Sequence, residues 1–173
     1  LHLRSIFEFS ELAQANDQLA TDWKYYPDEI HGTVPIVAAH HGLQFLFSWY
    51  PFEHWNQFYD PEPKLSGEEL VGLMVSHHEK LSNQLGYTFS PKEADVNRIA
   101  YMFLGRNDHE RAFSFFELNI RNKPQSANTH DSMGDYYRSI SDSANAVKYY
   151  SKALELGGVD GTKDKLEDLQ KSN

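Results

Sequence analysis

The fold is decided by residues 99–118, IAYMFLGRNDHERAFSFFEL, which recur 34 positions later as residues 133–152, MGDYYRSISDSANAVKYYSK. In this alignment small residues match small ones and rings match rings. The matched pairs are Ile99 with Met133, Ala100 with Gly134, Phe103 with Tyr137, Asp108 with Asp142, Ala112 with Ala146 and Phe116 with Tyr150. Antiparallel helices pack closely where a small residue on one faces a large residue on the other. The sequence therefore predicts two helical hairpins, about residues 93–124 and 127–158.

This period and the order of small and aromatic residues within it resemble the tetratricopeptide repeat family. The resemblance implies a mainly α-helical, TPR-like array of antiparallel hairpins that serves packing and protein contact rather than catalysis. Two repeats are fewer than the ~3 that bury a continuous core. We expect a covering helix in residues 66–86, whose apolar face recurs at helical spacing. That face comprises Leu70, Leu73, Met74, Leu81 and Leu85, with His77 at its edge and His78 exposed.

Residues that begin or end helices stand at the boundaries of these segments. The expected start residues are Ser66, the capping box Ser90-Pro91-Lys92-Glu93, Asp108, Asp142 and Thr162, and the expected stop residues are Gly86, Pro124 and Gly157-Gly158. Serine, threonine and aspartate side chains accept hydrogen bonds from first-turn amides, and glycine or proline ends a helix. Thr162 would begin a capping helix, about residues 163–171, whose Leu166 and Leu169 cover the end of the array. Residues 66–173 are thus predicted to form one TPR-like helical domain.

The segment that precedes this domain, residues 1–65, has a different organisation. Residues 3–19 favour a helix, and residues 22–26, DWKYY, alternate in a way typical of a strand that Pro27 stops. A turn follows, and the apolar segment 36–50 favours a second helix. Residues 51–65 contain three prolines and are expected to be a linker.

The run from Tyr25 to Pro35, YYPDEIHGTVP, resembles the final strand and catalytic-histidine loop of bacterial esterases of the alpha/beta-hydrolase family. Some of these resemble the siderophore-esterase branch and carry a tetratricopeptide extension, which residues 112–120 (AFSFFELNI) and 131–137 (DSMGDYY) also resemble. The resemblance covers nearly the whole chain. It implies that residues 1–50 are the terminal helix, strand and helix of an incomplete hydrolase domain.

The resemblance implies one site residue, His31, as the general base of the parent serine hydrolase. In that family the serine, on a G-x-S-x-G elbow, and the acid both precede the histidine. This sequence contains no G-x-S-x-G, and Asp28 and Glu29 are too close to His31 to be the expected acid. From the residues alone, His31 is an ordinary turn histidine bonded to a nearby carbonyl. We therefore expect the chain by itself to be inert, with no cofactor.

The amino-acid composition argues against several classes of binding partner. A formal charge of −9 argues against nucleic acid and anionic membranes, and no stretch approaches the ~18 apolar residues of a spanning helix. The absence of cysteine excludes disulfides, thiolate nucleophiles and cysteine-bound zinc, but leaves cytoplasm and bacterial periplasm both open. Because the first residue is Leu1, we expect the true amino terminus to lie upstream.

Two other constellations suggest binding chemistry. The pairs His40-His41 and His77-His78 invite a metal interpretation, but adjacent helical side chains point about 100° apart, so we predict no metal site. An aromatic cluster is expected to fix the linker to the array, with a sugar or ligand platform as the alternative. Its members are Trp49, Tyr50, Phe52, Trp55, Phe58 and Tyr59.

The first helices of the two hairpins would present their inward residues to a groove. These residues are Ala94, Asn97, Tyr101, Asn128, Asp131 and Asp135. The two aspartates would repel a peptide carboxylate, so a basic or neutral partner fits better, and intramolecular packing against the hydrolase fits best.

The sequence favours one functional hypothesis: a TPR-like scaffold and protein-interaction segment at the carboxy terminus of a serine esterase. The alternative is a free-standing helical-repeat adaptor with no enzymatic parent. Expected partners are the missing hydrolase domain and a protein bound to the array. Without that domain, residues 20–50 would mediate a homodimer or fold onto the array, because their apolar faces need cover.

Overall fold

The computed structural model describes residues 2–62 and 64–172, and every regular element in these ranges is an α-helix. The helices are α1 (His2–Gln14), α2 (Val34–Leu46), α3 (Trp55–Tyr59), α4 (Gly67–Leu85), α5 (Glu93–Gly105), α6 (His109–Asn122), α7 (Ala127–Ser139), α8 (Ser143–Glu155) and α9 (Thr162–Ser172). The prediction of a mainly helical protein is confirmed. None of the helices described is long and apolar enough to cross a bilayer. The chain divides into two compact units, Leu1–Pro51 (unit 1) and Phe52–Asn173 (unit 2).

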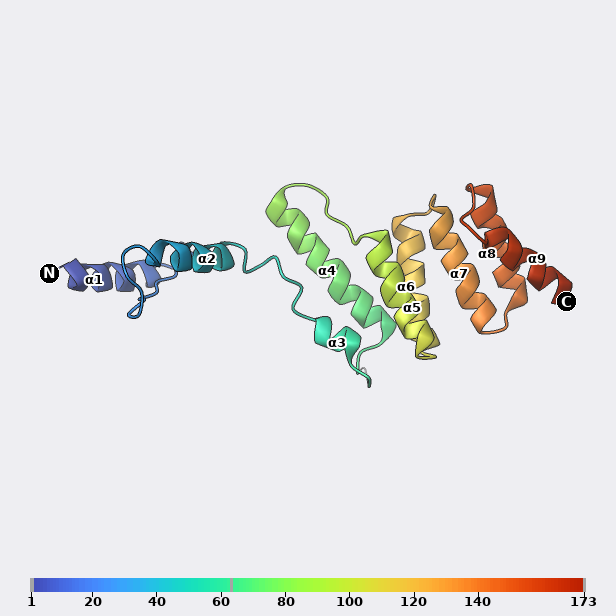
Figure 1. Ribbon diagram of the computed structural model, residues 1–173, viewed down its shortest axis with the longest axis horizontal. Coiled ribbons are helices and arrows are strands. Elements are labelled where there is room, and N and C mark those ends of the chain that lie inside the picture. The colour runs from blue at the N-terminus through green and yellow to red at the C-terminus, as the bar shows by residue number, and fades with distance from the viewer. Residues whose placement is uncertain (1, 63, 173) are drawn as a thin grey trace. The chain divides into compact units, whose positions relative to one another are not determined.

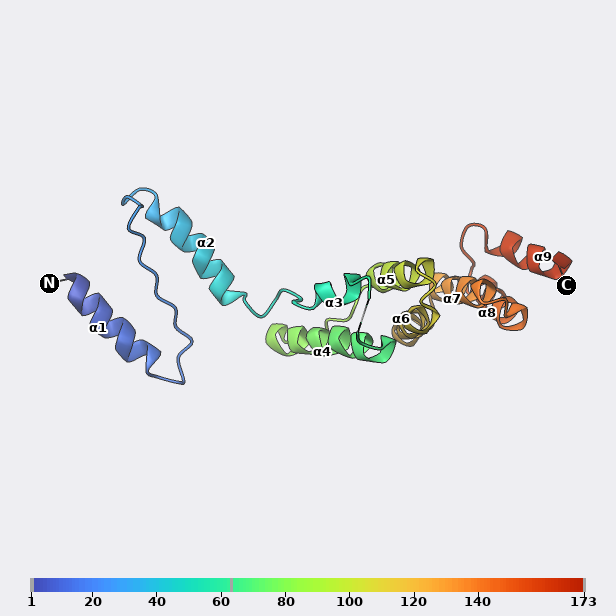
Figure 2. The same ribbon diagram turned by 90° about the horizontal axis from the view of Figure 1, so that it is seen from below.

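Unit 2 is a row of paired helices. Helix α5 pairs with α6 and α7 pairs with α8, while α4 and α7 pack on α6 and α9 packs on α8 (Figures 1 and 2). The starts of α5 and α7, Glu93 and Ala127, are one sequence period apart, and so are the starts of α6 and α8, His109 and Ser143. The internal period of the sequence is therefore the period of the hairpins.

The hairpins close through the small residues that the sequence alignment marked. Ala100, Ala112 and Ala146 are fully buried. A Cβ atom added at Gly134 would lie 2.5 Å from the ring of Tyr150, so only glycine lets α8 approach α7 this closely. Between and around these sites lies one apolar core. It includes Phe58, Leu70, Met74, Val96, Ile99, Phe103, Phe115, Phe116, Leu118 and Met133.

Both hairpin turns have the same geometry. Asn107 and Ser141 adopt the left-handed region with φ of 59° and 61°, and each precedes a capping aspartate. Asp108 accepts from the Arg111 amide at 3.3 Å, and Asp142 accepts from the Asn145 amide at 3.1 Å. These two predicted caps are confirmed.

The ends of α4 also agree with the sequence. Ser66 forms a reciprocal capping box with Glu69, and Gly86 ends the helix in the left-handed conformation. The predicted exposure of His78 is wrong, because its ring is half-buried, stacks on Phe89 and contacts the Met74 carbonyl at 2.8 Å.

Two predicted caps are wrong. The N-cap of α5 is Lys92, and no Ser90 capping box forms. The Glu93 carboxylate instead accepts hydrogen bonds from Ser126 and Asn128, which reach it from the second hairpin. Thr162 is the first residue of α9 rather than its cap, and its hydroxyl donates to Asp131 at 2.7 Å.

Residues 51–65, expected to be a linker, include α3 and the fully buried Phe58, while Pro63 lies outside the described residues. Two arginines of the first hairpin hold this segment by its backbone. Arg106 donates to the Asp60 carbonyl at 3.2 Å, and Arg111 donates to the Leu65 carbonyl at 2.7 Å.

Unit 1 corrects the predicted helix-strand-helix. Helix α1 ends at Gln14 rather than Leu19, and residues 22–26 form no strand. A strand needs ladder hydrogen bonds to a neighbouring strand, and the described part of the chain has none to offer. The segment is held by side chains instead, since Trp23 packs edge-on against Phe7 with ring centroids 5.0 Å apart.

Candidate functional site

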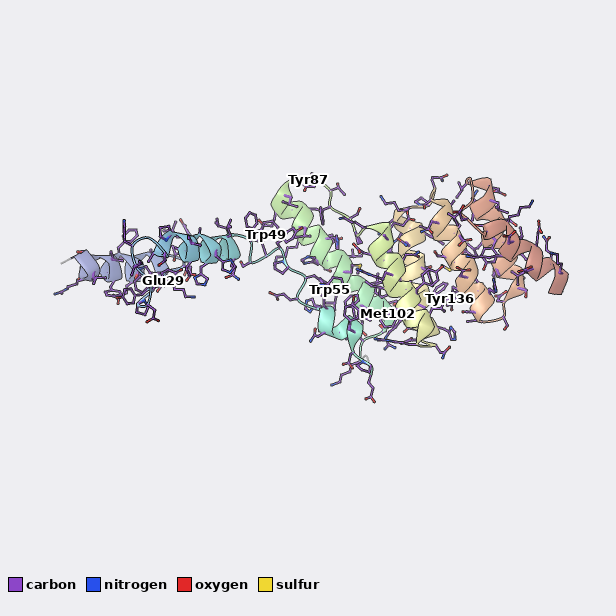
Figure 3. All side chains as sticks on the ribbon, in the orientation of Figure 1. Glu29, Trp49, Trp55, Tyr87, Met102 and Tyr136 are labelled. Carbon is purple, nitrogen blue, oxygen red and sulfur yellow. The ribbon has the colours of Figure 1, made fainter. Side chains whose placement is uncertain are left out.

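His31, the one predicted catalytic residue, lies in the loop before α2. Figure 3 labels Glu29, which stands two residues earlier in the same loop. The loop is shaped by Thr33, whose hydroxyl accepts from the Ile30 amide at 3.1 Å. The His31 side chain is exposed, and the residues that the structure describes give it no hydrogen bond. No serine or carboxylate of these residues therefore forms a catalytic pair with it.

A different histidine of unit 1 has polar partners. The His41 ring lies 2.7 Å from the Tyr26 hydroxyl at Nδ1 and 3.3 Å from the Lys24 amine at Nε2. Because an ammonium only donates, Nε2 accepts and the Nδ1 proton goes to the tyrosine oxygen. His41 thus attaches residues 24–26 to α2. The described residues contain no cluster of histidine and carboxylate side chains able to hold a metal ion.

The most extensive polar site lies on α7, where the sequence placed two groove aspartates. Asp131, only 4% exposed, accepts from Thr162 Oγ1 and Lys165 Nζ, both at 2.7 Å. Asp135 accepts from the same Lys165 amine at 2.8 Å and from the hydroxyls of Tyr101 and Tyr150 at 2.6 and 2.7 Å. We call Asp131 and Asp135 the α7 carboxylate pair.

Burial and these bonds shift the titration of the groups around the pair. Burial, and then the hydrogen bond to Asp135, raises the pKa of both Tyr101 and Tyr150. Burial alone would lower the pKa of Lys165, but its bonds to the two carboxylates outweigh burial and raise the pKa above the ordinary 10.5. The network is therefore held with its phenols neutral and its amine charged.

The other predicted groove residues are less engaged. Ala94 is exposed, and Asn128 donates to the Glu93 carboxylate at 2.9 Å. The Asn97 Oδ1 atom is buried without a hydrogen-bond partner within the described residues. Of the predicted groove residues outside α7, Tyr101 thus contacts the α7 carboxylate pair. Ala94 and Asn97 form no hydrogen bond with it, and Asn128 bonds to Glu93 instead.

Sequence reasoning missed Lys165 as a member of this site. The available signal was the period itself, because Lys165 follows Asp131 by one full repeat. Sequence-based charge counting treated both aspartates as free to repel a ligand. In the structure the amine of Lys165 already neutralises part of their charge.

The predicted aromatic cluster divides between the two units. In unit 2, Phe52 packs edge-on against Trp55, Phe58 and His77, with centroid distances of 4.9, 5.3 and 5.2 Å. Phe58 continues into the core through Phe115 at 5.7 Å. Trp55 on α3 is 39% exposed, whereas Tyr136 on α7 is buried (Figure 3). Phe52 and Phe58 therefore pack with the core, whereas Trp55 and Tyr59, the latter 48% exposed, lie at the surface.

No family model, curated protein or solved structure matches this chain at a significant level.

Proposed function

We propose that this chain is the carboxy-terminal part of a serine esterase of the alpha/beta-hydrolase family, and that unit 2 is its TPR-like protein-contact scaffold. The observation that carries the proposal is the apolar surface of unit 1. None of residues 3–51 is buried. Its exposed large hydrophobic residues are Leu3, Ile6, Phe7, Phe9, Leu12, Leu19, Tyr25, Ile30, Ile36, Leu43, Leu46, Phe47 and Tyr50.

Such a surface requires a covering partner. Leu12 and Ile36 are 74% and 73% exposed, and burying one such side chain contributes roughly 1.5–3 kcal/mol. Large exposed apolar surfaces mark interaction sites. A hydrolase domain packed on α1 and α2 would cover them, which agrees with the esterase resemblance of residues 25–35.

His31 would then act only in the assembled enzyme. A general base needs its nucleophile within hydrogen-bond reach. The exposed His31 side chain is open to a serine and an acid supplied by the covering domain. Unit 2 contributes no reacting group and acts as the scaffold.

The test is hydrolysis of a p-nitrophenyl ester by the protein encoded by the whole reading frame containing these residues. We expect activity, and we expect His31→Ala to lower it by roughly 10²–10⁴-fold, the usual contribution of a general base. His40→Ala is the matched control, because His40 is also exposed and lies nearby in sequence on α2. An active enzyme whose rate is unchanged by His31→Ala would show that His31 is wrongly assigned.

A second function, the free-standing adaptor, is favoured by one observation: unit 2 has a complete core of its own. The reading frame separates the two hypotheses. A G-x-S-x-G motif about 100 or more residues upstream supports the esterase. A frame that opens at or near Leu1, with no ester hydrolysis by its product, supports the adaptor.

A further inference from the structure

The α7 carboxylate pair depends on a cation supplied by another helix. The side chains of Asp131 and Asp135 are 6% and 22% exposed, and Lys165 of α9 bridges them. A carboxylate this far from water is unfavourable unless it is paired and hydrogen-bonded. The surface of α7 is therefore shaped to receive an amine.

Helix α9, which supplies that amine, packs on α8 and reaches α7 through polar side chains. It has 11 residues, and isolated helices of that length are marginal in water. Its two leucines, Leu166 and Leu169, are only half-buried, and Thr162 is its one fully buried residue among those described. The connection to α8 contains Gly157, Gly158 and Gly161, all with positive φ. The contacts of α9 with the α7 carboxylate pair are made by Lys165 and Thr162.

The register explains why α9 lies there. Its start, Thr162, falls where the first helix of a third hairpin would begin, and Lys165 occupies the position equivalent to Asp131. In α7 the close approach to α8 is made at Gly134, and the equivalent position of α9 is Asp168. A charged residue there disfavours a further packed helix, so α9 occupies the position without extending the array.

We propose that the face of α7 bearing Asp131 and Asp135, bordered by Tyr101, is a docking site for a lysine-bearing helix of a partner protein, and that α9 occupies it in the unbound chain. The partner presents a lysine three residues after a serine or threonine, as Thr162 precedes Lys165. The proposal rests on the scaffold role of unit 2 and is independent of the esterase.

The geometry specifies this partner chemistry. One ammonium reaches two carboxylates at 2.7 and 2.8 Å and lies 5.5 Å from the centre of the Tyr150 ring. A hydroxyl one turn earlier satisfies the remaining Asp131 oxygen. The net charge of −9 on the chain also favours a basic partner over an acidic one.

The probe is a fluorescein-labelled peptide with the sequence of residues 158–173, titrated into the full chain by fluorescence anisotropy. In the wild type the tethered α9 competes at high effective concentration and binding is weak. Lys165→Met releases this competitor, so we expect a dissociation constant lower by at least about tenfold. Lys163→Met is the matched control, since Lys163 is 77% exposed and its described ion pair is with Glu167 at 3.7 Å.

Two further arms fix the chemistry. A peptide with methionine in place of Lys165 should lose at least about tenfold in affinity for the Lys165→Met chain, and so should the intact peptide for the Lys165→Met/Asp135→Asn chain. Thr162→Ala, which leaves all charges in place, provides a second releasing variant if Lys165→Met does not fold. Equal affinity for the lysine and methionine peptides overturns the proposal.

Hydrogen exchange tests whether Lys165 holds α9 on α7. Amides of residues 163–171 should exchange faster in Lys165→Met than in the wild type or in Lys163→Met. Unchanged protection of α9 would mean that the lysine does not hold the site, and the proposal fails. If peptide binding fails while unit 2 still binds the purified catalytic domain, only this inference is lost and the scaffold function stands.

Discussion

Lys165 Nζ lies 2.7 Å from Asp131 Oδ2, and the two residues are separated by one repeat period. Tyr101 and Asp135 are separated by the same period, and their side chains are 2.6 Å apart. Equivalent positions on successive first helices therefore contact each other directly. This line of polar contacts joins α5 to α7 and α7 to α9 and fixes the register of the three helices. The apolar core fills the space between the hairpins.

Alkaline pH should destabilise unit 2 through this line. The pKa values of Tyr101, Tyr150 and Lys165 are all raised in the folded chain. A raised pKa contributes stability that is complete below the ordinary value, here 10.0 for tyrosine and 10.5 for lysine, and that is lost as pH rises through the folded value. The free energy of unfolding, measured with urea, should therefore stay level from about pH 8 to about pH 10 and fall above that.

The tyrosine contribution has its own variant. Tyr150→Phe keeps the buried ring, removes the hydrogen bond to Asp135 at 2.7 Å, and should lower stability near neutral pH by about 1.5–3 kcal/mol. It should also flatten the alkaline loss. Tyr87→Phe, at a 59% exposed position, should change neither quantity. An equally steep alkaline loss in Tyr150→Phe would contradict this account.

Gly134 and Gly105 should respond oppositely to alanine. The added methyl at Gly134 meets the Tyr150 ring at 2.5 Å, and that ring is fully buried and hydrogen-bonded, so Gly134→Ala should cost about 1–3 kcal/mol. Gly105 ends α5 with nothing within 4 Å of the added atom, so Gly105→Ala should gain up to about 1 kcal/mol. Urea midpoints measure both, and a neutral Gly134→Ala would mean that α8 can move away.

The helical hairpins were predictable because short-range and repeated signals agree there. Gly134 aligns with Ala100 in the sequence repeat. Asp108 and Asp142 mark the same turn in the two hairpins, and their spacing fixes the helix starts without any tertiary information. These signals are local in sequence. For this reason the repeat segment from Glu93 to Glu155 could be placed helix by helix.

The missed features depend on competing long-range partners. Glu93 stands at the position of a capping-box residue in the sequence, but its carboxylate accepts hydrogen bonds from Ser126 and Asn128 instead. Thr162 has cap chemistry, but the buried Asp131 captures its hydroxyl. The strand expected at residues 22–26 depends on a neighbouring strand that the described residues do not provide. The candidate site was half foreseen, since its aspartates were identified and its lysine was not.

A substitution in the turn of the second hairpin should stabilise the protein. Ser141 adopts φ 61° on the surface, a conformation that is strained for a residue with a Cβ atom. Ser141→Gly should raise the free energy of unfolding by about 1 kcal/mol. Ser139→Gly, at the last residue of α7, is the control and should not raise it, because glycine there also removes the hydrogen bond from the Ser139 hydroxyl to the Tyr136 carbonyl. Thermal and urea unfolding of both variants test the sign, and destabilisation by Ser141→Gly would refute the assigned turn geometry.

The apolar faces of unit 1 should make the isolated chain self-associate. Leu12 on α1 and Leu43 on α2 are 74% and 56% exposed, and covering each in a dimer contributes roughly 1.5–3 kcal/mol. Leu12→Glu and Leu43→Glu should each weaken the dimer at least about tenfold in light scattering across a concentration series. Ile140→Glu, 39% exposed in unit 2, should leave it unchanged. A wild-type monomer at every concentration, with residues 20–50 exchanging like an unfolded chain, would contradict the idea that these faces are built to be covered.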